Sequence, residues 1–321
     1  MNGERTPHWG MGARIVGAGH YLPPRVVTNN DIAGIVDTTD EWIQQRVGIR
    51  TRHFADTDSV PDMAEFAARN ALGNAGVAAS EVDLVVVATC SNIDRTPSTA
   101  GRVAHRLGVP AAAVFDVNAA CSGFVHALEI AKQLLAGGSA ATALVIGAEK
   151  MTAVTDWSDR ATCVLVGDGA GALLLRATAH SELSPVAWGS APELTNSVLI
   201  EGAQPQFHQD GQRVFRWAIT AAAAHATAAL TAANLTPTDL GAFIPHQANL
   251  RIIEPLAVQL GLPESAHLAR DIQTSGNTSA ASIPLALSKM LAAGLLKTGS
   301  PMLLFGFGGG FSYAGLVARA P

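Results

Sequence analysis

The chain has 321 residues, of which 48% are hydrophobic and 15% charged, and its formal net charge is −5. This length is about twice the ~150 residues of a usual domain, and the net charge excludes a broad basic surface for nucleic acid or an anionic membrane. The first ten residues are polar, no apolar run approaches the ~20 residues of a membrane span, and the three cysteines form no C-x-x-C pair. We therefore expect a protein with reduced thiols, a cytoplasmic location, and neither nucleic acid nor membrane as partner.

Short Val/Ile/Leu/Ala runs alternate with Ala-rich helical patterns along the chain, as in an α/β protein whose strands are covered on both faces. The predicted strands are 13–18, 84–88, 113–117, 143–147, 162–166, 170–176, 185–190, 242–244, 267–270, 302–307 and 311–318. The predicted helices are 63–75, 98–107, 122–136, 215–233, 250–260 and 279–293. The polar segment 195–213 is predicted to be a crossing loop between two halves.

Two stretches of the sequence can be aligned with a constant shift of 156 residues, which places Cys121 on Asn277 and Cys90 on His246. Both stretches have the order strand, short loop, helix, with a polar residue where the loop meets the helix. This order favours a duplicated unit whose two copies bring a thiol, an imidazole and a carboxamide to one seam.

Cys121 lies in Asn-Ala-Ala-Cys-Ser-Gly at the predicted start of a helix. A helix N-terminus stabilises the thiolate, which is the form of cysteine that attacks carbonyl carbon. The alternative for any free cysteine is a buried apolar filler, and Cys90 and Cys163 are interpreted in that way.

His246 follows the predicted strand 242–244, and polar residues at strand ends of α/β sheets often serve catalysis. A neutral imidazole can accept a hydrogen bond or donate one to an oxyanion, although a structural histidine is equally compatible with the pattern. Asn277 can act as a helix N-cap or as a catalytic amide. The ten histidines have no metal-ligand spacing, so no metal is expected.

Two glycine-rich segments have different interpretations. The segment 167–171 resembles a dinucleotide-binding loop, but a strand pattern follows it where such a loop requires a helix, so we predict a turn between antiparallel strands. The segment 306–311 also joins two strands. Its bare backbone amides can form either a tight bend or an oxyanion hole.

The sequence resembles the β-ketoacyl-acyl-carrier-protein synthases III, which are condensing enzymes of the thiolase fold. The resemblance extends over almost the whole chain and is strongest at 37–42, 48–53, 167–172, 245–251 and 276–284. It implies a five-layer αβαβα fold of two similar halves, 11–178 and 179–321, and a homodimer. Elongating ketoacyl synthases carry a second histidine, and thiolases a second cysteine, at the position of Asn277.

The resemblance also implies a reaction and its residues. Cys121 takes an acyl group from acyl-CoA, and malonyl-acyl-carrier-protein then loses CO₂ and condenses with it while His246 and Asn277 bind the malonyl thioester oxygen. The backbone amides of Cys121 and Gly309 match the family's oxyanion donors, and Phe307 its gating phenylalanine. Acyl-CoA is a substrate, and no cofactor is implied.

Contacts outside the reacting centre are implied in the same way. Trp42, Arg46 and Arg160 match residues that hold the adenine and phosphate end of CoA, since flat aromatic and guanidinium faces suit adenine and arginine suits phosphate. Arg216 and Arg251 match basic residues at the mouth of the tunnel, where the carrier protein docks.

Three positions depart from well-known members of the family. Val258 and Gln259 replace a basic pair that binds the carrier protein. Thr96 stands where some members close the acyl pocket of the partner subunit with an aromatic ring, which suggests room for a longer or branched primer. The chain therefore fits an enzyme that initiates fatty-acid synthesis, or a primer-selecting ketosynthase or acyltransferase of a polyketide pathway. A non-catalytic partner subunit would have lost the nucleophile, which is present.

Overall fold

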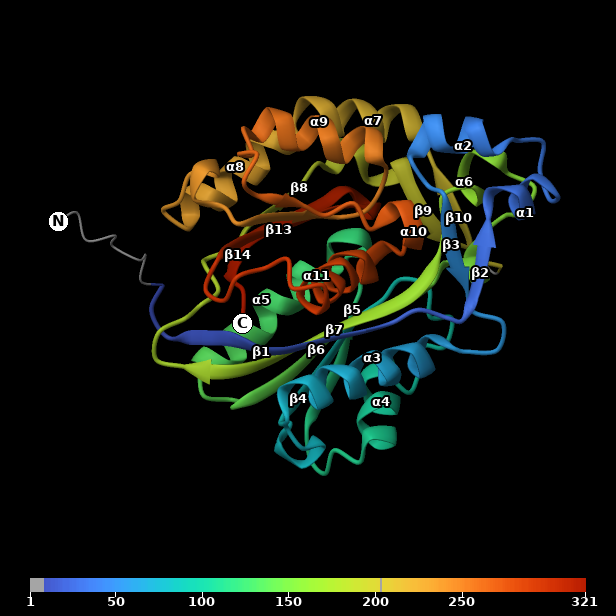
Figure 1. The fold of residues 1–321 in the computed structure, drawn as a ribbon. Coiled ribbons are helices and arrows are strands. Elements are labelled where there is room, and N and C mark those ends of the chain that lie inside the picture. The colour runs from blue at the N-terminus through green and yellow to red at the C-terminus, as the bar shows by residue number, and fades with distance from the viewer. Residues whose placement is uncertain (1–8, 203) are drawn as a thin grey trace.

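Two five-stranded sheets with the same topology form the centre of the molecule in a computed structural model that describes residues 9–202 and 204–321 (Figure 1). In each sheet the strand next to one edge lies parallel to both of its neighbours, and two further strands are added antiparallel at the other side. The first sheet has the order β1 (Gly12–Tyr21), β7 (Asp168–Thr178), β6 (Thr142–Lys150), β4 (Leu84–Ala88), β5 (Ala113–Val117). The second has the order β8 (Ala187–Ser190), β14 (Ser312–Arg319), β13 (Pro301–Gly308), β11 (Ala242–Pro245), β12 (His267–Leu268).

Helices cover both faces of each sheet and complete five layers, αβαβα, as predicted (Figure 1). The central layer consists of α5 (Gly123–Ala136) and α11 (Ser282–Ala292), which pack between the sheets. One outer layer contains α3 (Val60–Ala75) and α4 (Thr99–Leu107), and the other α7 (Gly211–Thr220), α8 (Ala222–Ala232) and α9 (Leu250–Leu260). None of the described helices is long and apolar enough to cross a membrane.

Burial on both faces explains the continuous apolar strands of the sequence. Along β4, Val85 and Val87 pack against the outer helices, whereas Leu84 and Val86 pack against the central layer. Every residue of this strand is buried. A strand between two helical layers has no solvent face, so its sequence does not alternate.

Several short elements lie outside the predicted pattern. They are β2 (Arg25–Thr28), α1 (Asn29–Ala33), α2 (Asp40–Val47), β3 (Thr51–Phe54), α6 (Arg160–Cys163), β9 (Val198–Glu201), β10 (Gln206–Gln209) and α10 (Ile272–Ser275). The predicted crossing loop 195–213 is instead mainly the hairpin β9–β10 followed by the start of α7, and its first residues end a 3-10 helix. One face of this small hairpin is open to solvent and carries polar residues, so the composition of the segment resembles that of a loop.

Three predicted elements are wrong in detail. Residues 162–166 are not a strand, because the Asp159 side chain caps the short helix α6 there. The predicted helix 215–233 breaks at Ala221, whose φ of −120° and ψ of −32° are not helical. The segment 167–171 is not a turn, since β7 begins at Asp168. A Cβ on Gly171 would lie 2.3 Å from the backbone N of Leu285, so this glycine allows α11 to pack directly on the strand.

The constant shift of 156 residues is also wrong. The 3-10 helix Ala120–Ser122 leads into α5, and the 3-10 helix Ser279–Ala281 leads into α11. The corresponding residues, Ala120 and Ser279, both have positive φ, 44° and 45°. The true shift here is therefore 279 − 120 = 159, which pairs Asn277 with Asn118 instead of with Cys121.

Candidate active site

Cys121 lies at the junction between β5 and α5, inside the 3-10 helix that precedes α5. The Oδ1 atom of Asn118 accepts the N–H of Ala120 at 3.2 Å and shapes the turn before the thiol. Ala120 has a φ of 44°, a conformation that non-glycine residues rarely adopt and that is frequent at functional sites. Cys121 therefore occupies the helix start that its sequence context predicts.

The loop between β13 and β14 passes directly beside the thiol. Gly308 has a φ of 155°, and a Cβ there would lie 2.9 Å from Cys121 Sγ, so only glycine fits. Burial raises the pKa of Cys121, and hydrogen bonds from the Ser279 hydroxyl and from the backbone N–H of Gly309 oppose that rise. The Ser279 Oγ lies 3.5 Å from Cys121 Sγ. The Gly309 N–H is thus directed at the sulfur atom that would carry an acyl group.

His246 follows the last residue of β11 and is 2% exposed. Burial lowers the pKa of its imidazole to about 3, so the ring is neutral near pH 7. Its Nδ1 lies 2.8 Å from Ser282 Oγ. Because that oxygen already accepts the N–H of Gln247 at 3.3 Å, the Ser282 hydroxyl can donate its own proton to Nδ1. With the Ser282 hydroxyl as the donor of this bond, the ring proton lies on Nε2.

Asn277 lies at the carboxyl end of α10, where Gly276 changes the chain direction. Its backbone N–H donates a hydrogen bond to the C=O of Leu165, and its backbone C=O accepts one from the N–H of Gly167. The side-chain Oδ1 accepts the N–H of Ser279 at 2.9 Å. Since this bond fixes which end of the amide is oxygen, Nδ2 is the end that remains as a donor.

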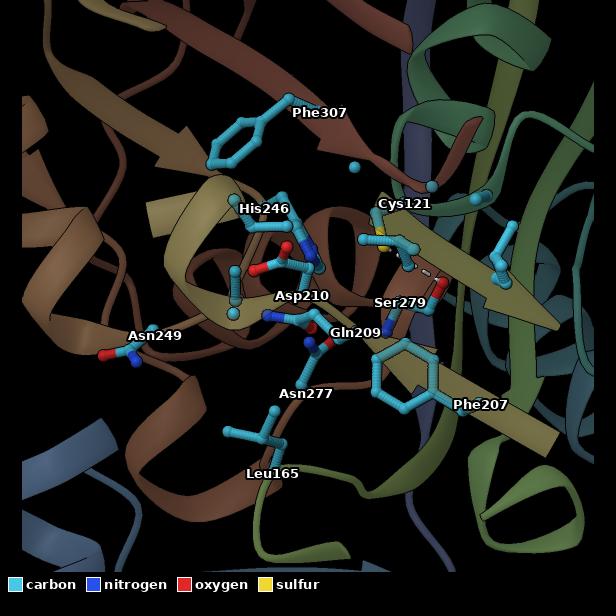
Figure 2. Close-up of a pocket in the computed structure, with 18 of the residues that line it drawn as sticks. Cys121, Leu165, Phe207, Gln209, Asp210, His246, Asn249, Asn277, Ser279 and Phe307 are labelled. Atoms are coloured by element: carbon cyan, nitrogen blue, oxygen red, sulfur yellow. Dashed lines mark hydrogen bonds between the residues drawn. The ribbon is translucent and has the colours of Figure 1, made fainter. Parts of the chain in front are cut away.

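One cavity of about 1020 Å³ brings these groups together, and it is lined by residues of both halves. In Figure 2, Cys121, His246 and Asn277 come from different elements and approach a common space, with Phe307 beside His246. The His246 and Phe307 rings meet edge to face, with centroids 6.0 Å apart. The cavity walls also contain Gly309 and residues of the hairpin β9–β10.

The predicted basic and aromatic residues divide into two groups. Trp42, Arg46, Arg160 and Arg251 line the cavity, whereas Arg216 is exposed and is not among the lining residues. The Arg160 guanidinium stacks on the Trp42 ring, 4.9 Å from its centroid.

Arg251 stacks on the ring of Phe215, with 5.5 Å between the guanidinium carbon and the ring centroid. Thr96 is exposed on the loop before α4 and does not line this cavity. Its expected place was the pocket of a partner subunit, so that expectation remains a prediction. On α9, Val258 is 79% exposed, and the Gln259 amide donates to the backbone C=O of Ile219.

Sequence reasoning missed a buried cluster next to the nucleophile. Ser279 and Cys90 both line the cavity, and Cys90 is not an inert filler. Its Sγ lies 3.4 Å from Ser279 Oγ and donates to the carboxylate of Glu149 at 3.2 Å. Glu149 lies within an apolar strand and is completely buried. A lone acidic residue inside such a strand was the available signal. Within the described residues, no group of three or more His, Cys, Asp or Glu is arranged to hold a metal ion.

A nucleophilic thiol, a neutral imidazole and a carboxamide at the seam of a duplicated αβαβα fold define a condensing enzyme of the thiolase fold. The chain matches the family model of 3-oxoacyl-[acyl-carrier-protein] synthase III over residues 115–192 and the model of its C-terminal part over residues 230–320. It therefore belongs to the β-ketoacyl-acyl-carrier-protein synthase III family and is an acyltransferase.

Similar proteins agree with this assignment. Beta-ketoacyl-[acyl-carrier-protein] synthase III 4 of Streptomyces coelicolor is 56% identical, with 97% of this chain and 99% of that protein aligned. The priming β-ketosynthase of the R1128 polyketide pathway has a crystal structure that superimposes with a TM-score of 0.95 and 41% identity, covering 99% of both chains. The synthase III structure from Pseudomonas aeruginosa superimposes with a TM-score of 0.91 and 38% identity, covering 97% of this chain and 98% of the other.

Proposed function

We propose that this enzyme transfers an acyl group from acyl-CoA to Cys121 and condenses it with malonyl-acyl-carrier-protein, initiating fatty-acid synthesis. The convergence of Cys121, His246 and Asn277 on one cavity carries the proposal. In the first half reaction the thiolate attacks the acyl-CoA carbonyl carbon and CoA leaves as the thiol. The backbone N–H groups of Cys121 and Gly309 stabilise the oxyanion that forms.

The second half reaction uses the two side-chain donors. The Nε2–H of His246 and the Nδ2–H of Asn277 bind the thioester oxygen of the malonyl group while its carboxylate leaves as CO₂. The resulting enolate attacks the carbonyl carbon of the Cys121 thioester, and the β-ketoacyl-carrier-protein forms as the thiolate leaves. A neutral imidazole is required because it donates a hydrogen bond without giving up a proton, and the pKa of about 3 supports that state. All these groups belong to the protein, so the proposed chemistry needs no cofactor.

The cavity mouth supports the proposed binding of CoA and of the carrier protein. Trp42 offers a ring face for adenine, and Arg46 and Arg160 offer guanidinium groups for phosphate. With Arg160 only 4.9 Å from the Trp42 ring, a purine inserted between them would displace the arginine. Arg251 and the exposed Arg216 supply positive charge for the acidic carrier protein, whereas the exposed Val258 supplies none at the position of the family's basic pair.

Transfer of acyl groups is tested by intact-protein mass. Incubation with an acyl-CoA should raise the mass of the wild type by the mass of the acyl group and leave Cys121→Ser unchanged. Addition of malonyl-acyl-carrier-protein should then remove that mass and release a β-ketoacyl product. Equal labelling of both proteins would rule out Cys121 as the acyl carrier.

A priming role in a polyketide pathway is the second candidate. The structural similarity to the R1128 priming ketosynthase, with a TM-score of 0.95, favours it. The small Thr96 adds to this candidate if the residue faces a partner's acyl pocket. A panel of acyl-CoA primers tested with malonyl-loaded carrier proteins of both pathways separates the two, because a fatty-acid-initiating enzyme should condense its primer with the carrier protein of fatty-acid synthesis and a polyketide enzyme with that of its own pathway.

We also propose a cytoplasmic homodimer. The three cysteines are all free thiols, which suits a reducing compartment. Strand β5 is bonded to β4 along one edge, and no strand of the described residues pairs with its other edge. Ala113 and Val114 are exposed on this strand. An open apolar edge readily pairs with the same strand of a second copy.

A further inference from the structure

Glu149 is a carboxyl group buried beside the nucleophile without an opposite charge. It is 0% exposed, and among the described residues it makes no ion pair. Its oxygens instead accept backbone N–H groups of Cys90 at 3.1 Å, Ser91 at 3.0 Å and Ala280 at 3.4 Å. The hydroxyls of Thr89 and Ser91 donate as well. So many donors suit a carboxylate, although burial opposes the charge.

An unbroken series of side-chain contacts joins Glu149 to the reacting sulfur. Cys121 Sγ lies 3.5 Å from Ser279 Oγ, which lies 3.4 Å from Cys90 Sγ. Cys90 Sγ donates to Glu149 Oε1 at 3.2 Å. Each intermediate group is both a donor and an acceptor, so all three contacts can point in the same direction at once. Figure 2 shows the first contact of the series, between Cys121 and Ser279.

His246 is poorly suited to take the proton of Cys121. Its pKa of about 3 makes an imidazolium unfavourable near pH 7. Its Nδ1 is engaged by Ser282, and no hydrogen bond joins it to Cys121 in the part of the chain that the structure describes. The thiol still has to lose a proton before it attacks. That proton needs another acceptor within reach.

We propose that Glu149 receives the proton of Cys121 through Ser279 and Cys90 when the nucleophile is activated. Cys121 S–H passes its proton to Ser279 Oγ, the Ser279 hydroxyl proton moves to Cys90 Sγ, and the Cys90 proton moves to Glu149. The products are a Cys121 thiolate and a neutral Glu149 carboxylic acid. When CoA leaves as a thiolate, the proton returns from Glu149 through Cys90 to Ser279, and the Ser279 hydroxyl gives its proton to the CoA sulfur, so CoA is released as the thiol. The proposal rests on Cys121 being the nucleophile of the function proposed above.

Conservation of charge makes this transfer less costly in a buried site than ionisation of both groups. Burial raises the pKa of Glu149 and also that of Cys121, so ionising both groups together is costly. Moving one proton between them keeps a single negative charge in the site. The titratable groups that face Glu149 are Cys90, after β4, and Cys121, before α5. The residue of β7 paired with it is Gly169, and the turn before α11 presents the Ala280 N–H.

Alkylation of Cys121 by iodoacetamide tests the proton path without any acyl-CoA. Rates would be measured between pH 5 and 10 by mass spectrometry of the peptide that contains Cys121. Internal transfer changes no net protonation, so the wild-type rate should reach a plateau at neutral pH and rise again when both groups ionise. In Glu149→Gln the plateau should disappear, and the rate at pH 7 should fall by about 10²-fold, as for loss of a general base.

A higher alkylation rate in Glu149→Gln than in the wild type at pH 7 would overturn the proposal. If Glu149 acts only as a nearby charge, its removal lowers the pKa of Cys121 and alkylation at pH 7 becomes faster. An unchanged profile would contradict the proposal as well. Failure of acyl-CoA to label the wild type would instead refute the proposed function while leaving the alkylation result intact.

Substitutions along the path provide matched controls. Cys90→Ser retains a group that donates and accepts, so it should keep the plateau, whereas Cys90→Ala should lose it. Ser279→Ala should also lose the plateau. Alanine is compatible with the backbone at this position, because Ala120 adopts a φ of 44° and Ser279 one of 45°. Thr89→Val removes a hydroxyl bond to Glu149 outside the path and should resemble the wild type. Equal profiles for Cys90→Ser and Cys90→Ala would rule out the path, even if Glu149→Gln fails to fold.

Discussion

Asn118 and Asn277 hold equivalent turns in the two halves of the molecule. The Oδ1 atom of Asn118 accepts the N–H of Ala120 at 3.2 Å, and that of Asn277 accepts the N–H of Ser279 at 2.9 Å. Each acceptor bond stabilises a residue with positive φ just before a helix of the central layer. The first turn presents the Cys121 thiol to the cavity, and the second presents the Asn277 amide itself. The same type of turn therefore positions a nucleophile in one half and a hydrogen-bond donor in the other.

Replacement of Asn277 should separate the two half reactions. Asn277→Ala removes the Nδ2 donor proposed to bind the malonyl thioester oxygen, and loss of one such donor typically costs roughly 10²–10³ in rate. Decarboxylation of malonyl-acyl-carrier-protein should therefore slow by that factor, while acylation of Cys121 continues. Radiolabelled CO₂ release and intact mass measure the two steps separately. Loss of acylation alone would contradict the role given to Asn277.

His246 should make the protein less stable in acid. Its pKa is about 3 in the folded protein against 6.5 for an ordinary histidine. The unfolded chain therefore binds an extra proton between these values, and the free energy of unfolding falls as the pH drops from 6.5 towards 3. Above pH 6.5 this effect is absent. Thermal melting of wild type and His246→Gln between pH 4.5 and 7.5 should show the steeper loss in the wild type, and parallel curves would exclude the buried neutral ring.

The two glycines at 171 and 73 should respond in opposite directions to alanine. A Cβ at Gly171 meets the backbone of α11 at 2.3 Å, so Gly171→Ala should destabilise by at least the roughly 1–3 kcal/mol typical of an overfilled core. Gly73 lies within α3 with nothing within 4 Å of a Cβ, and Gly73→Ala should stabilise by roughly 0.5–1 kcal/mol. Urea denaturation measures both. A neutral Gly171→Ala would show that the helix can move away from the sheet.

The open edge of β5 provides a test of the dimer. The N–H of Ala113 donates to Asp83 and the C=O of Val117 accepts from Thr89, so residues 113, 115 and 117 face β4 and Val114 faces the other edge. Val114→Pro removes an outward N–H with no loss to the bonds with β4. The dimer should weaken at least tenfold in sedimentation equilibrium. A dimer of unchanged affinity would place the interface elsewhere.

Thr96 should control the choice of primer if it faces the acyl pocket of the partner subunit. Thr96→Phe would fill space that long or branched chains need, and pocket contacts of one methylene change selectivity by roughly 10–200-fold. kcat/KM should then fall far more for those primers than for acetyl-CoA. Since Thr96 is exposed in the single chain, its substitution should leave the melting temperature of the protein nearly unchanged. A uniform fall across the primer panel would show that Thr96 does not contact the acyl chain.

Local patterns in the sequence determined the α/β class, most of the strands of the two large sheets, and the place of Cys121 at a helix start. These features depend on residues near one another, such as the apolar run of β4 or the small residues before α5. The family motifs located His246 and Asn277 as well. The sequence could not give the register between the halves, because a duplicated chain drifts by insertions and only superimposed turns reveal the shift of 159.

Tertiary structure alone decided what surrounds the nucleophile. Cys90, Glu149 and Ser279 belong to three elements far apart in the chain, and the packing of α11 against the first sheet brings them to Cys121. No spacing predicts such a contact, since it depends on how closely two helical layers approach. That approach is set by glycines, whose missing side chains leave no pattern of their own in the sequence. The nucleophilic role of Cys121 could therefore be predicted from its neighbours in sequence, but the proposed proton path could be inferred only from its neighbours in space.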